Sequence, residues 1–346
     1  VLILYYHGAH IYSTDCAPKN FRFSGWLKMT LSKLAKLANV AVSTASKAFS
    51  MSGDINEQTR EEIFRIAREN GCFKKFFNAK YPKFVAAVIC PEVNSRHYSE
   101  LCFALQRRLQ ARGCELCIAS SEFSHAVALE KTDYYEKYSS ADAIILIDSG
   151  ITLPSHETPI ILVGDHTENA DVTIRLDYES ALKTAVLDFK SSGVSRIGFI
   201  GEEHTAAKLA AFKKIVAEIF GKADEKYILT VPERFEKGGY AAARELYSSG
   251  ALPEALICAY DDMALGAMRF LSEKNISVPG QIKILGMDNI PHSEYFVPSL
   301  STVDFMNEKI AETAAESVFE ILDGKTPQKE YCFSARLIRR ESSLTP

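Results

Sequence analysis

The 346-residue sequence predicts a small all-α unit followed by a large α/β unit whose sheets are parallel. Residues 30–50 show two short helical patterns at the spacing of a helix-turn-helix. From Phe84 onward, short β-branched runs alternate with longer helical patterns, which is typical of parallel sheets covered by helices on both faces. A chain of this length accommodates two or three domains of ~100–200 residues each.

The first helix of the predicted helix-turn-helix has one apolar stripe, formed by Leu34, Leu37 and Ala38 at positions i, i+3 and i+4. Ala35 is small enough to let a second helix approach closely. Asn39 then supplies a residue that tolerates the positive φ of a tight turn. The segment therefore predicts two helices joined by a sharp turn.

The second helix turns its larger apolar side chains inward and leaves a face of short groups that ends in a cation. That face consists of Val42, Ser43, Ser46 and Lys47. A helix with such a face can enter the major groove of DNA. An ordinary αα-hairpin shows the same local pattern, so a purely structural hairpin stays open as the alternative.

A third helix is predicted after the second. Asn56 can cap its start, Glu57 lies in its first turn, and Gly71 stands just past its end. Ile63 and Ile66 lie on one face and give this helix an apolar stripe. Three short helices of this kind make a small domain.

The charge of the chain is unevenly distributed. Between Lys28 and Lys83, eleven Lys or Arg stand against five Asp or Glu, a net +6, whereas the whole chain carries −4. Residues 1–27 add +1, which leaves −11 from Phe84 onward. Phosphate binding requires basic charge, so the helix-turn-helix segment is the candidate for contact with DNA and the acidic remainder is not.

The α/β unit is predicted from eight strands and five intervening helices. The predicted strands span residues 85–90, 115–119, 143–147, 160–163, 197–200, 227–231, 255–259 and 282–286. The predicted helices span residues 98–112, 178–192, 205–220, 239–249 and 262–274. No internal repeat or low-complexity stretch interrupts this alternation.

Several other classes of protein leave no signature in the sequence. No apolar run approaches the ~18 residues of a membrane span, and residues 1–6 are too short for the core of a signal peptide. The eight cysteines are scattered through apolar segments, which is typical of reduced thiols in the cytoplasm. Cys114 and Cys117 would face opposite sides of a strand and have no second ligand pair, so neither a metal nor a cofactor is expected.

An enzyme is not expected either. The sequence has neither the glycine-rich dinucleotide-binding motif G-x-G-x-x-G nor the phosphate-binding loop G-x-x-x-x-G-K. Its eight histidines are dispersed along the chain.

The three-helix segment resembles the headpiece of the LacI/GalR (lactose-repressor) family of bacterial transcription regulators. The matching headpiece residues are Thr30-Leu31, Leu34-Ala35, Val40, Thr44, Ser46, Lys47, Ile55-Asn56 and Thr59-Arg60. Matches in the core occur at residues 259–267, 278–279, 284–289, 300–303 and 339–342. The resemblance therefore covers the chain from Thr30 to about Ser343.

The resemblance implies two groups of DNA contacts. By position, the base-reading residues of the family fall on Val42, Ser43 and Lys47. The phosphate contacts fall on Thr30, Leu31, Thr44, Ser46 and Thr59. Ala41 stands where the family usually has Ser, which removes a helix cap worth roughly 1 kcal/mol.

Residues 74–83 correspond to the hinge that follows the headpiece in the family, where a short helix inserts a leucine into the minor groove. Here the Pro, Asn, Arg and Leu of the family pattern are all replaced. The register places Tyr81 at the position of the wedge, with Lys74, Lys75 and Lys80 near phosphates. A basic linker that does not insert into DNA is the open alternative.

For residues 84–343, the resemblance implies an effector-binding and dimerisation core of two α/β lobes, like those of periplasmic sugar-binding proteins. Lobe 1 is expected to comprise about residues 84–166 and 293–325, and lobe 2 about residues 167–292 and 326–343. The chain would then cross between the lobes near residues 164–169, 288–293 and 324–328. The headpiece is expected to span residues 29–73.

By position, the resemblance also implies an effector site at the strand ends that face the cleft between the lobes. Its residues would be His97, Tyr98, Asp148, Phe235, Tyr260 and Asp288. The carboxylate of Asp288 could accept two hydroxyl hydrogen bonds from a sugar, or it could instead brace a lobe crossing.

Two departures from the family affect the expected ligand. Ala206 stands where sugar-binding members usually have Arg, and Tyr260 stands where they have Asn. Lys208 lies one turn beyond Ala206 and is expected to point at a different angle. A sugar or sugar derivative, a larger aromatic-stacked effector and no effector at all therefore remain open.

The sequence is thus expected to encode a cytoplasmic transcription repressor that is not an enzyme. It is expected to be a homodimer that binds a pseudo-palindromic operator in double-stranded DNA and is controlled by a carbohydrate-like small molecule. A solute-binding protein or sensor with the same core and no operator is the alternative. Residues 1–28 precede the point where family members start, so Met29 as the natural start or a disordered arm is expected.

Overall fold

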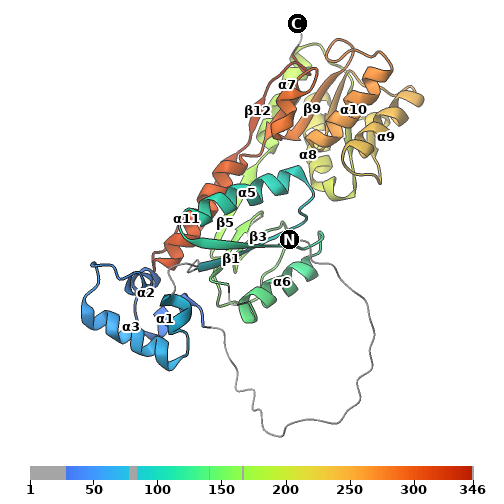
Figure 1. The fold of residues 1–346 in the computed structure, drawn as a ribbon. Helices are drawn as coiled ribbons and strands as arrows, with labels where there is room; N and C mark the ends of the chain where they lie inside the picture. The colour runs from blue at the N-terminus through green and yellow to red at the C-terminus, as the bar shows by residue number, and fades with distance from the viewer. Residues whose placement is uncertain (1–28, 78–83, 140, 166, 345–346) are drawn as a thin grey trace, which may run out of the picture.

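The computed structural model describes residues 29–77, 84–139, 141–165 and 167–344. Three bodies lie in a row in Figure 1, with a helical headpiece (blue) at one end, one α/β lobe in the middle and a second α/β lobe at the other end. Within the described residues, no helix combines the length and the apolar character that a membrane span requires. The predicted fold class is confirmed.

The headpiece begins with the helix-turn-helix that the sequence predicts. Its helices are α1 (Leu31–Leu37), α2 (Val42–Phe49) and α3 (Glu57–Glu69). Asn39 in the turn has φ 53°, and the side chain of Asn56 accepts a hydrogen bond from the backbone N–H of Thr59 at 2.7 Å. At the start of α2, Ala41 makes no side-chain cap hydrogen bond, as expected from the departure at this position.

A fourth short helix, α4 (Phe73–Phe77), packs onto the headpiece. The ring of Phe76 lies 5.5 Å from that of Phe49, and the rings of Phe73 and Phe64 meet edge to face at 5.1 Å. The beginning of the predicted hinge therefore belongs to the aromatic core of the headpiece. Tyr81, the predicted wedge, lies outside the described residues.

Lobe 1 contains a six-stranded sheet in which every pair of neighbouring strands is parallel. In spatial order, the strands are β11 (Glu330–Ser334), β5 (Val172–Asp177), β4 (Ile160–Val163), β3 (Ala143–Ile147), β1 (Phe84–Cys90) and β2 (Cys114–Ser120). Its helices are α5 (Arg96–Gln110), α6 (His125–Lys137) and α11 (Asn307–Leu322).

Alternate side chains of the central strands enter two separate cores, one on each face of the lobe 1 sheet. Val88 and Ile145 pack into the core that includes side chains of α5 and α11, whereas Ile89 and Ile144 pack into the core that includes Ala128 of α6. Because both faces are covered, the central strands read as continuous apolar runs in the sequence.

Lobe 2 repeats this architecture. Its strands, in spatial order, are β12 (Arg336–Ile338), β10 (Ser301–Asp304), β9 (Lys283–Asp288), β8 (Ala255–Cys258), β6 (Ile197–Gly201) and β7 (Ile228–Thr230). Its helices are α7 (Glu179–Ser191), α8 (Ala206–Phe220), α9 (Phe235–Ser248) and α10 (Asp261–Glu273), with short 3₁₀ turns at Glu203–Thr205, Glu225–Tyr227 and Pro291–Tyr295. Only the edge strand β12 is antiparallel to its neighbour among the described strands.

The predicted crossings between the lobes are wrong, because each crossing lies later in the chain. The first follows Asp177, since β5 still belongs to the lobe 1 sheet, and the second follows Asp304 at the end of β10 in lobe 2. The third lies between Ser334 of β11 and Arg336 of β12. Strands β5, β10, β11 and β12 were not predicted from the sequence, and local pattern does not show which sheet a strand joins.

The headpiece contacts lobe 1 through a buried carboxylate. The hydroxyl of Ser32 on α1 donates to Oδ1 of Asp142 at 3.3 Å, and the backbone N–H of Val85 donates to Oδ2 of the same side chain at 2.9 Å. Asp142 is only 5% exposed, and burial raises its pKa to about 6. The charged form of Asp142 is therefore disfavoured at this junction.

We expect the titration of Asp142 to make the free energy of unfolding depend on pH. Because the pKa of Asp142 is raised, the folded chain holds a proton between about pH 4 and pH 6 that the unfolded chain has lost. The free energy of unfolding should therefore fall as the pH rises through this window, by up to about 3 kcal/mol, and then level off. Denaturant unfolding of wild type and Asp142→Asn at a series of pH values measures the difference.

Asp133→Asn is the matched control for this experiment, since Asp133 has half of its side chain exposed and lies on α6 of the same lobe. Its pH profile should follow that of the wild type. Parallel profiles for the wild type and Asp142→Asn would show that the burial of Asp142 does not affect stability.

Candidate functional site

The recognition face of α2 combines half-buried and exposed side chains. Val42, Ser43, Thr44 and Ser46 are half-buried, while Lys47 is exposed at the end of the helix. The ammonium of Lys47 lies 3.4 Å from Asp54, and both side chains are more than half exposed. Exposed ion pairs of this kind contribute little to stability. Lys47 can therefore leave Asp54 and contact DNA with little loss of stability.

The predicted phosphate contacts on α1 are buried in this arrangement. Thr30 is 4% exposed, and its hydroxyl caps the helix by accepting from the backbone N–H of Lys33. Leu31 has no exposed surface, and the neighbouring Ser32 is bonded to Asp142. In this conformation the side chains of Thr30 and Leu31 are therefore not exposed for contact with DNA.

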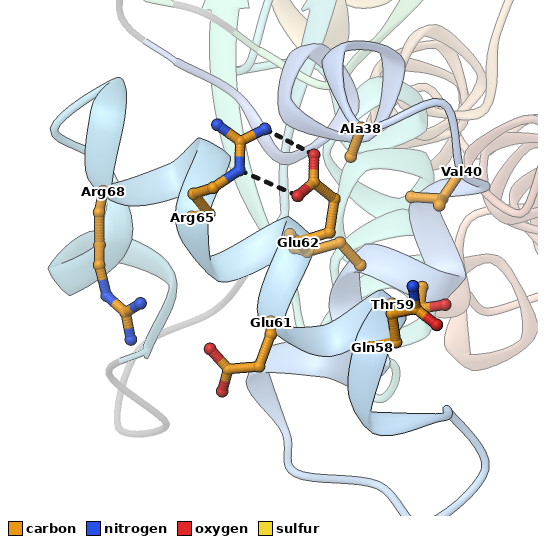
Figure 2. A pocket seen from close by; sticks show the side chains of 9 residues that line it. Ala38, Val40, Gln58, Thr59, Glu61, Glu62, Arg65 and Arg68 are labelled. Atoms are coloured by element: carbon orange, nitrogen blue, oxygen red, sulfur yellow. Dashed lines mark hydrogen bonds and ion pairs between the residues drawn. The ribbon is translucent and has the colours of Figure 1, made fainter.

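Figure 2 shows a hollow of about 690 Å³ on the headpiece, between the helix-turn-helix and α3. Glu62 and Arg65 on its wall form a two-point ion pair at 2.6 and 2.9 Å. Arg65 also pairs with Glu69, and Glu61 adds a further carboxylate to the lining. With Arg68, the lining carries two carboxylates and two guanidinium groups, and this balanced charge makes the hollow a poor phosphate site, although Thr59 lies on its wall.

A cleft of about 1010 Å³ lies between the two lobes. Residues at or just beyond the carboxyl ends of β1, β3 and β4 line it from lobe 1, namely Pro91, Ile147, Asp148, Ser149, Val163, Gly164 and Asp165. Residues from the start of α7 and from α8 line it from lobe 2. Ligands of open α/β sheets bind at such strand ends.

Three of the six predicted effector residues, His97, Tyr98 and Asp148, line this cleft. Burial lowers the pKa of His97, which keeps its imidazole neutral, and raises the pKa of the Tyr98 hydroxyl. Burial also raises the pKa of Asp148, while the ring of His125 at 3.1 Å opposes this shift.

Asp288 lies beside the cleft and is engaged by protein groups. Its Oδ1 is 3.4 Å from the ammonium of Lys208 and 3.8 Å from Nδ1 of His97. Lys208 also donates to the carbonyl of Ala259 at 2.7 Å and lies 4.7 Å from the ring centre of Phe305. Asp288 thus pairs with Lys208 of its own lobe, and its 3.8 Å separation from the imidazole of His97 in lobe 1 is longer than a hydrogen bond. Whether Asp288 binds a ligand or braces a lobe crossing stays a prediction.

Phe235 and Tyr260 do not belong to the described lining of the cleft. Their rings pack together at 5.8 Å, and the hydroxyl of Tyr260 accepts a hydrogen bond from the backbone N–H of Phe235 at 2.9 Å. Tyr260 is 7% exposed. In this conformation, Phe235 and Tyr260 therefore contact each other and do not line the cleft.

Several lining residues were missed from the sequence. Lys208 faces the cleft, and its angle differs from that of Ala206, which is not among the described lining residues. The lining residues missed from the sequence include Phe123, His125, His204, Phe305 and Asn307. Phe123 and His204 each follow the end of a strand, and this position is the signal by which they could have been found.

The cleft offers ring faces and neutral hydrogen-bonding groups together with a few charges. The ring of Phe305 packs against those of His97 and Tyr178, and the amide of Asn307 donates to the carbonyl of His97 at 3.2 Å. Such a lining suits a neutral, hydroxyl-rich ligand with an apolar face. Among the described residues, no three His, Cys, Asp or Glu side chains are placed to hold a metal ion.

The chain is similar to known regulators over almost its whole length. Residues 186–343 match the model of the periplasmic binding protein-like domain. The HTH-type transcriptional regulator AscG of Escherichia coli K12 is 26% identical over 339 residues, which cover 92% of this chain and 99% of AscG.

Solved structures have the same fold. The crystal structure of the Escherichia coli transcriptional repressor ascG superposes with a TM-score of 0.67 at 24% identity, covering 76% of this chain and all of that one. The complex of the transcriptional regulator CelR with cellobiose superposes with a TM-score of 0.62 at 20% identity, covering 91% of this chain and all of that one.

Proposed function

The chain belongs to the LacI/GalR family of transcription regulators, and on this basis we propose that it is a repressor that releases or binds its operator in response to a small molecule in the interlobe cleft. One observation carries the proposal: a helix-turn-helix headpiece and a two-lobed core with a hollow cleft occur in one chain. Because its target is DNA, the protein acts in the bacterial cytoplasm.

The effector we propose is a sugar or a sugar derivative. Ring faces stack on the apolar face of a sugar, and polar donors and acceptors bind its hydroxyl groups, which is the chemistry that His97, Tyr98, Asp148 and Asn307 supply. The cleft of about 1010 Å³ has room for more than one sugar ring. CelR was solved with cellobiose, so cellobiose is the first compound to test.

The proposed mechanism is a shift between two arrangements of the lobes. An effector that binds one arrangement of the lobes more tightly increases the population of that arrangement. The headpieces move with lobe 1, which they contact. Two headpieces are required, because one recognition helix covers only half of an operator, so we propose a homodimer on a pseudo-palindromic site.

The exposed apolar groups on α5 and the edge strand β2 favour this face of lobe 1 as the dimer contact. Phe103 is 58% and Ile118 43% exposed, and β2 lacks a second neighbour among the described strands. We expect Phe103→Glu and Ile118→Lys to weaken the dimer roughly 10-fold or more, since a charge would lie unpaired in the contact. Analytical ultracentrifugation over a concentration series measures the dissociation constant.

Tyr138→Glu is the control for the dimer experiment, since Tyr138 is 66% exposed just after α6, on the other side of the same sheet. It should leave the dimer unchanged. If Tyr138→Glu dissociates the dimer and the other two variants do not, the contact lies on the opposite face.

Selection of genomic DNA tests the proposed function. The full chain is mixed with sheared DNA from its source organism, and retained fragments are sequenced with and without cellobiose. We expect enrichment of a small set of fragments that share a pseudo-palindrome. No enrichment by a folded protein that still binds a sugar would favour the solute-binding alternative.

A further inference from the structure

The two lobes are joined beside the cleft by direct ion pairs. Nη1 and Nη2 of Arg234 in lobe 2 donate to the two carboxylate oxygens of Glu92 in lobe 1 at 2.6 and 2.7 Å. Arg96 in lobe 1 pairs with Glu236 at 2.9 Å and with Asp262, both in lobe 2. Two-point guanidinium–carboxylate contacts are among the strongest hydrogen-bonded pairs in proteins.

Two of these ion pairs, Arg234–Glu92 and Arg96–Asp262, are shielded from solvent on at least one side, whereas Arg96 and Glu236 are each 41% exposed. The side chain of Glu92 is 11% and that of Arg234 26% exposed, while Asp262 is 5% exposed. Separating the lobes would remove the arginine partner of Asp262, and water would then have to solvate its carboxylate. Removing one partner of such a partly buried pair costs more than removing one partner of an exposed pair, because it leaves an uncompensated charge.

An aromatic contact across the lobes accompanies the ion pairs. The ring of Phe123 in lobe 1 stacks on the imidazole of His204 in lobe 2, with 3.9 Å between the ring centres and 5° between the planes. The guanidinium of Arg234 lies 5.2 Å from the ring centre of Phe123 and 4.7 Å from that of Phe235. Arg234 thus joins the ion pair to the ring stack.

The backbone on both sides of this contact is strained. Glu122 and Phe123 have φ values of 53° and 58°, and Phe235 has a φ of 57°. The Cβ atom of an L-residue crowds the backbone in this left-handed region, and phenylalanine is an unusual occupant. Strain of this kind persists where the surrounding contacts hold it, and it is frequent at switch regions.

We propose that Glu92, Arg96, Phe123, His204, Arg234, Glu236 and Asp262 form an interlobe latch that holds the cleft closed in the absence of effector. This inference rests on the proposed function, because it concerns regulation of the same cleft. Phe123 and His204 line the cleft, so an effector that enters on this side must part their rings. The latch therefore sets how much of the ligand-free protein is open to the effector.

The test measures the distance between the lobes in the full-length, ligand-free protein. Donor and acceptor dyes are attached through unnatural amino acids at Glu130 on α6 and Glu245 on α9, both exposed. Arg234→Ala, Glu92→Gln and Phe123→Leu should each change the transfer efficiency and broaden its distribution. The double variant Glu92→Gln/Arg234→Ala should change it no further than Arg234→Ala alone, because the two residues act as one pair.

Arg196→Ala is the matched control. Arg196 pairs with Glu254 at 3.0 Å just before β6 and β8 of lobe 2, so its loss removes an ion pair away from the lobe crossings. Transfer efficiency should match that of the wild type. Unchanged efficiency in Arg234→Ala and Phe123→Leu, with near-UV circular dichroism showing both to be folded, would overturn the latch.

Selection of genomic DNA with the same proteins separates the two levels of the proposal. If the wild type enriches an operator but the latch variants leave the distance between the lobes unchanged, only the latch is refuted. If the variants change the distance between the lobes but the wild type enriches no DNA, the proposed function is refuted and the latch remains a property of the core.

Discussion

Replacing Lys47 with alanine is expected to weaken binding to the operator by roughly 1–3 kcal/mol per half-site, or about 5- to 150-fold in the dissociation constant. Lys47 is exposed at the end of α2, where its ammonium can donate to O6 and N7 of guanine. Preference at one base step of each half-site should be relaxed as well. Titration of the selected operator and of random DNA measures both effects.

Three further variants sort the contacts of the headpiece. Thr44→Ala or Ser46→Ala should weaken binding to all sequences alike, because phosphate contacts position the protein without specifying bases. Arg65→Ala removes a cation that pairs with Glu62 and Glu69 beside the hollow in Figure 2, and it should change operator affinity little. If Lys47→Ala lowers specific and random affinity by the same factor, base reading belongs to Val42 and Ser43 instead.

Total binding should also fall steeply with salt concentration. The lac repressor, whose family this chain shares, is the standard example of this behaviour, so the steep slope is an expectation by analogy. Lys47→Ala should reduce the slope only if Lys47 contacts phosphate.

The largest effect on stability is expected where α9 and α10 cross. A Cβ atom on Gly239 of α9 would lie 1.9 Å from the carbonyl oxygen of Met263 on α10, and one on Gly266 of α10 would lie 1.9 Å from that of Glu236 on α9. The obstacle is backbone in both cases, so the helices must separate. We expect Gly239→Ala and Gly266→Ala each to lower the free energy of unfolding by roughly 1–3 kcal/mol or more.

Thermal and denaturant unfolding of the two variants measures this loss. Gly53→Ala is the matched control, because a Cβ atom on Gly53 would meet no atom within 4 Å. The control should stay within about 0.5 kcal/mol of the wild type. Equal melting temperatures for Gly239→Ala and the wild type would mean that the two helices tolerate a wider spacing.

This crossing also supports the latch. Phe235 and Glu236 lie in the first turn of α9, and Asp262 lies in the first turn of α10. A change in the spacing of these helices therefore displaces the lobe 2 side of the interlobe contacts. Gly239→Ala should consequently change the interlobe transfer efficiency as well as the stability.

The sequence alone was sufficient for the headpiece, because local interactions determine its helix ends. The cap of Asn56 reaches three residues ahead, and the positive φ of Asn39 and Gly71 is a property of each residue and its turn. The eight predicted strands were found for a similar reason. Each is a short apolar run, which is the pattern of central strands buried on both faces, although the edge strands β2 and β7 are partly exposed.

Only the tertiary structure decided how these elements divide between the lobes. Strands β5 and β11 pair over a long separation in sequence, with Thr173 opposite Glu330, and the exposed side chains of β11 hide its pairing from any local pattern. The lobe crossings follow from such pairings, which is why their predicted positions were wrong.

The cleft and the interlobe contacts were decided in the same way. Glu92 and Arg234 are 142 residues apart, and Lys208 reaches the cleft through the placement of α8 against the two lobes. Predicted residues such as His97 and Asp148 lie in the cleft, because strand ends gather at one edge of a parallel sheet. Phe235 and Tyr260 pack on each other because the packing of α9 and α10 brings them together, and that packing depends on contacts that no local pattern contains.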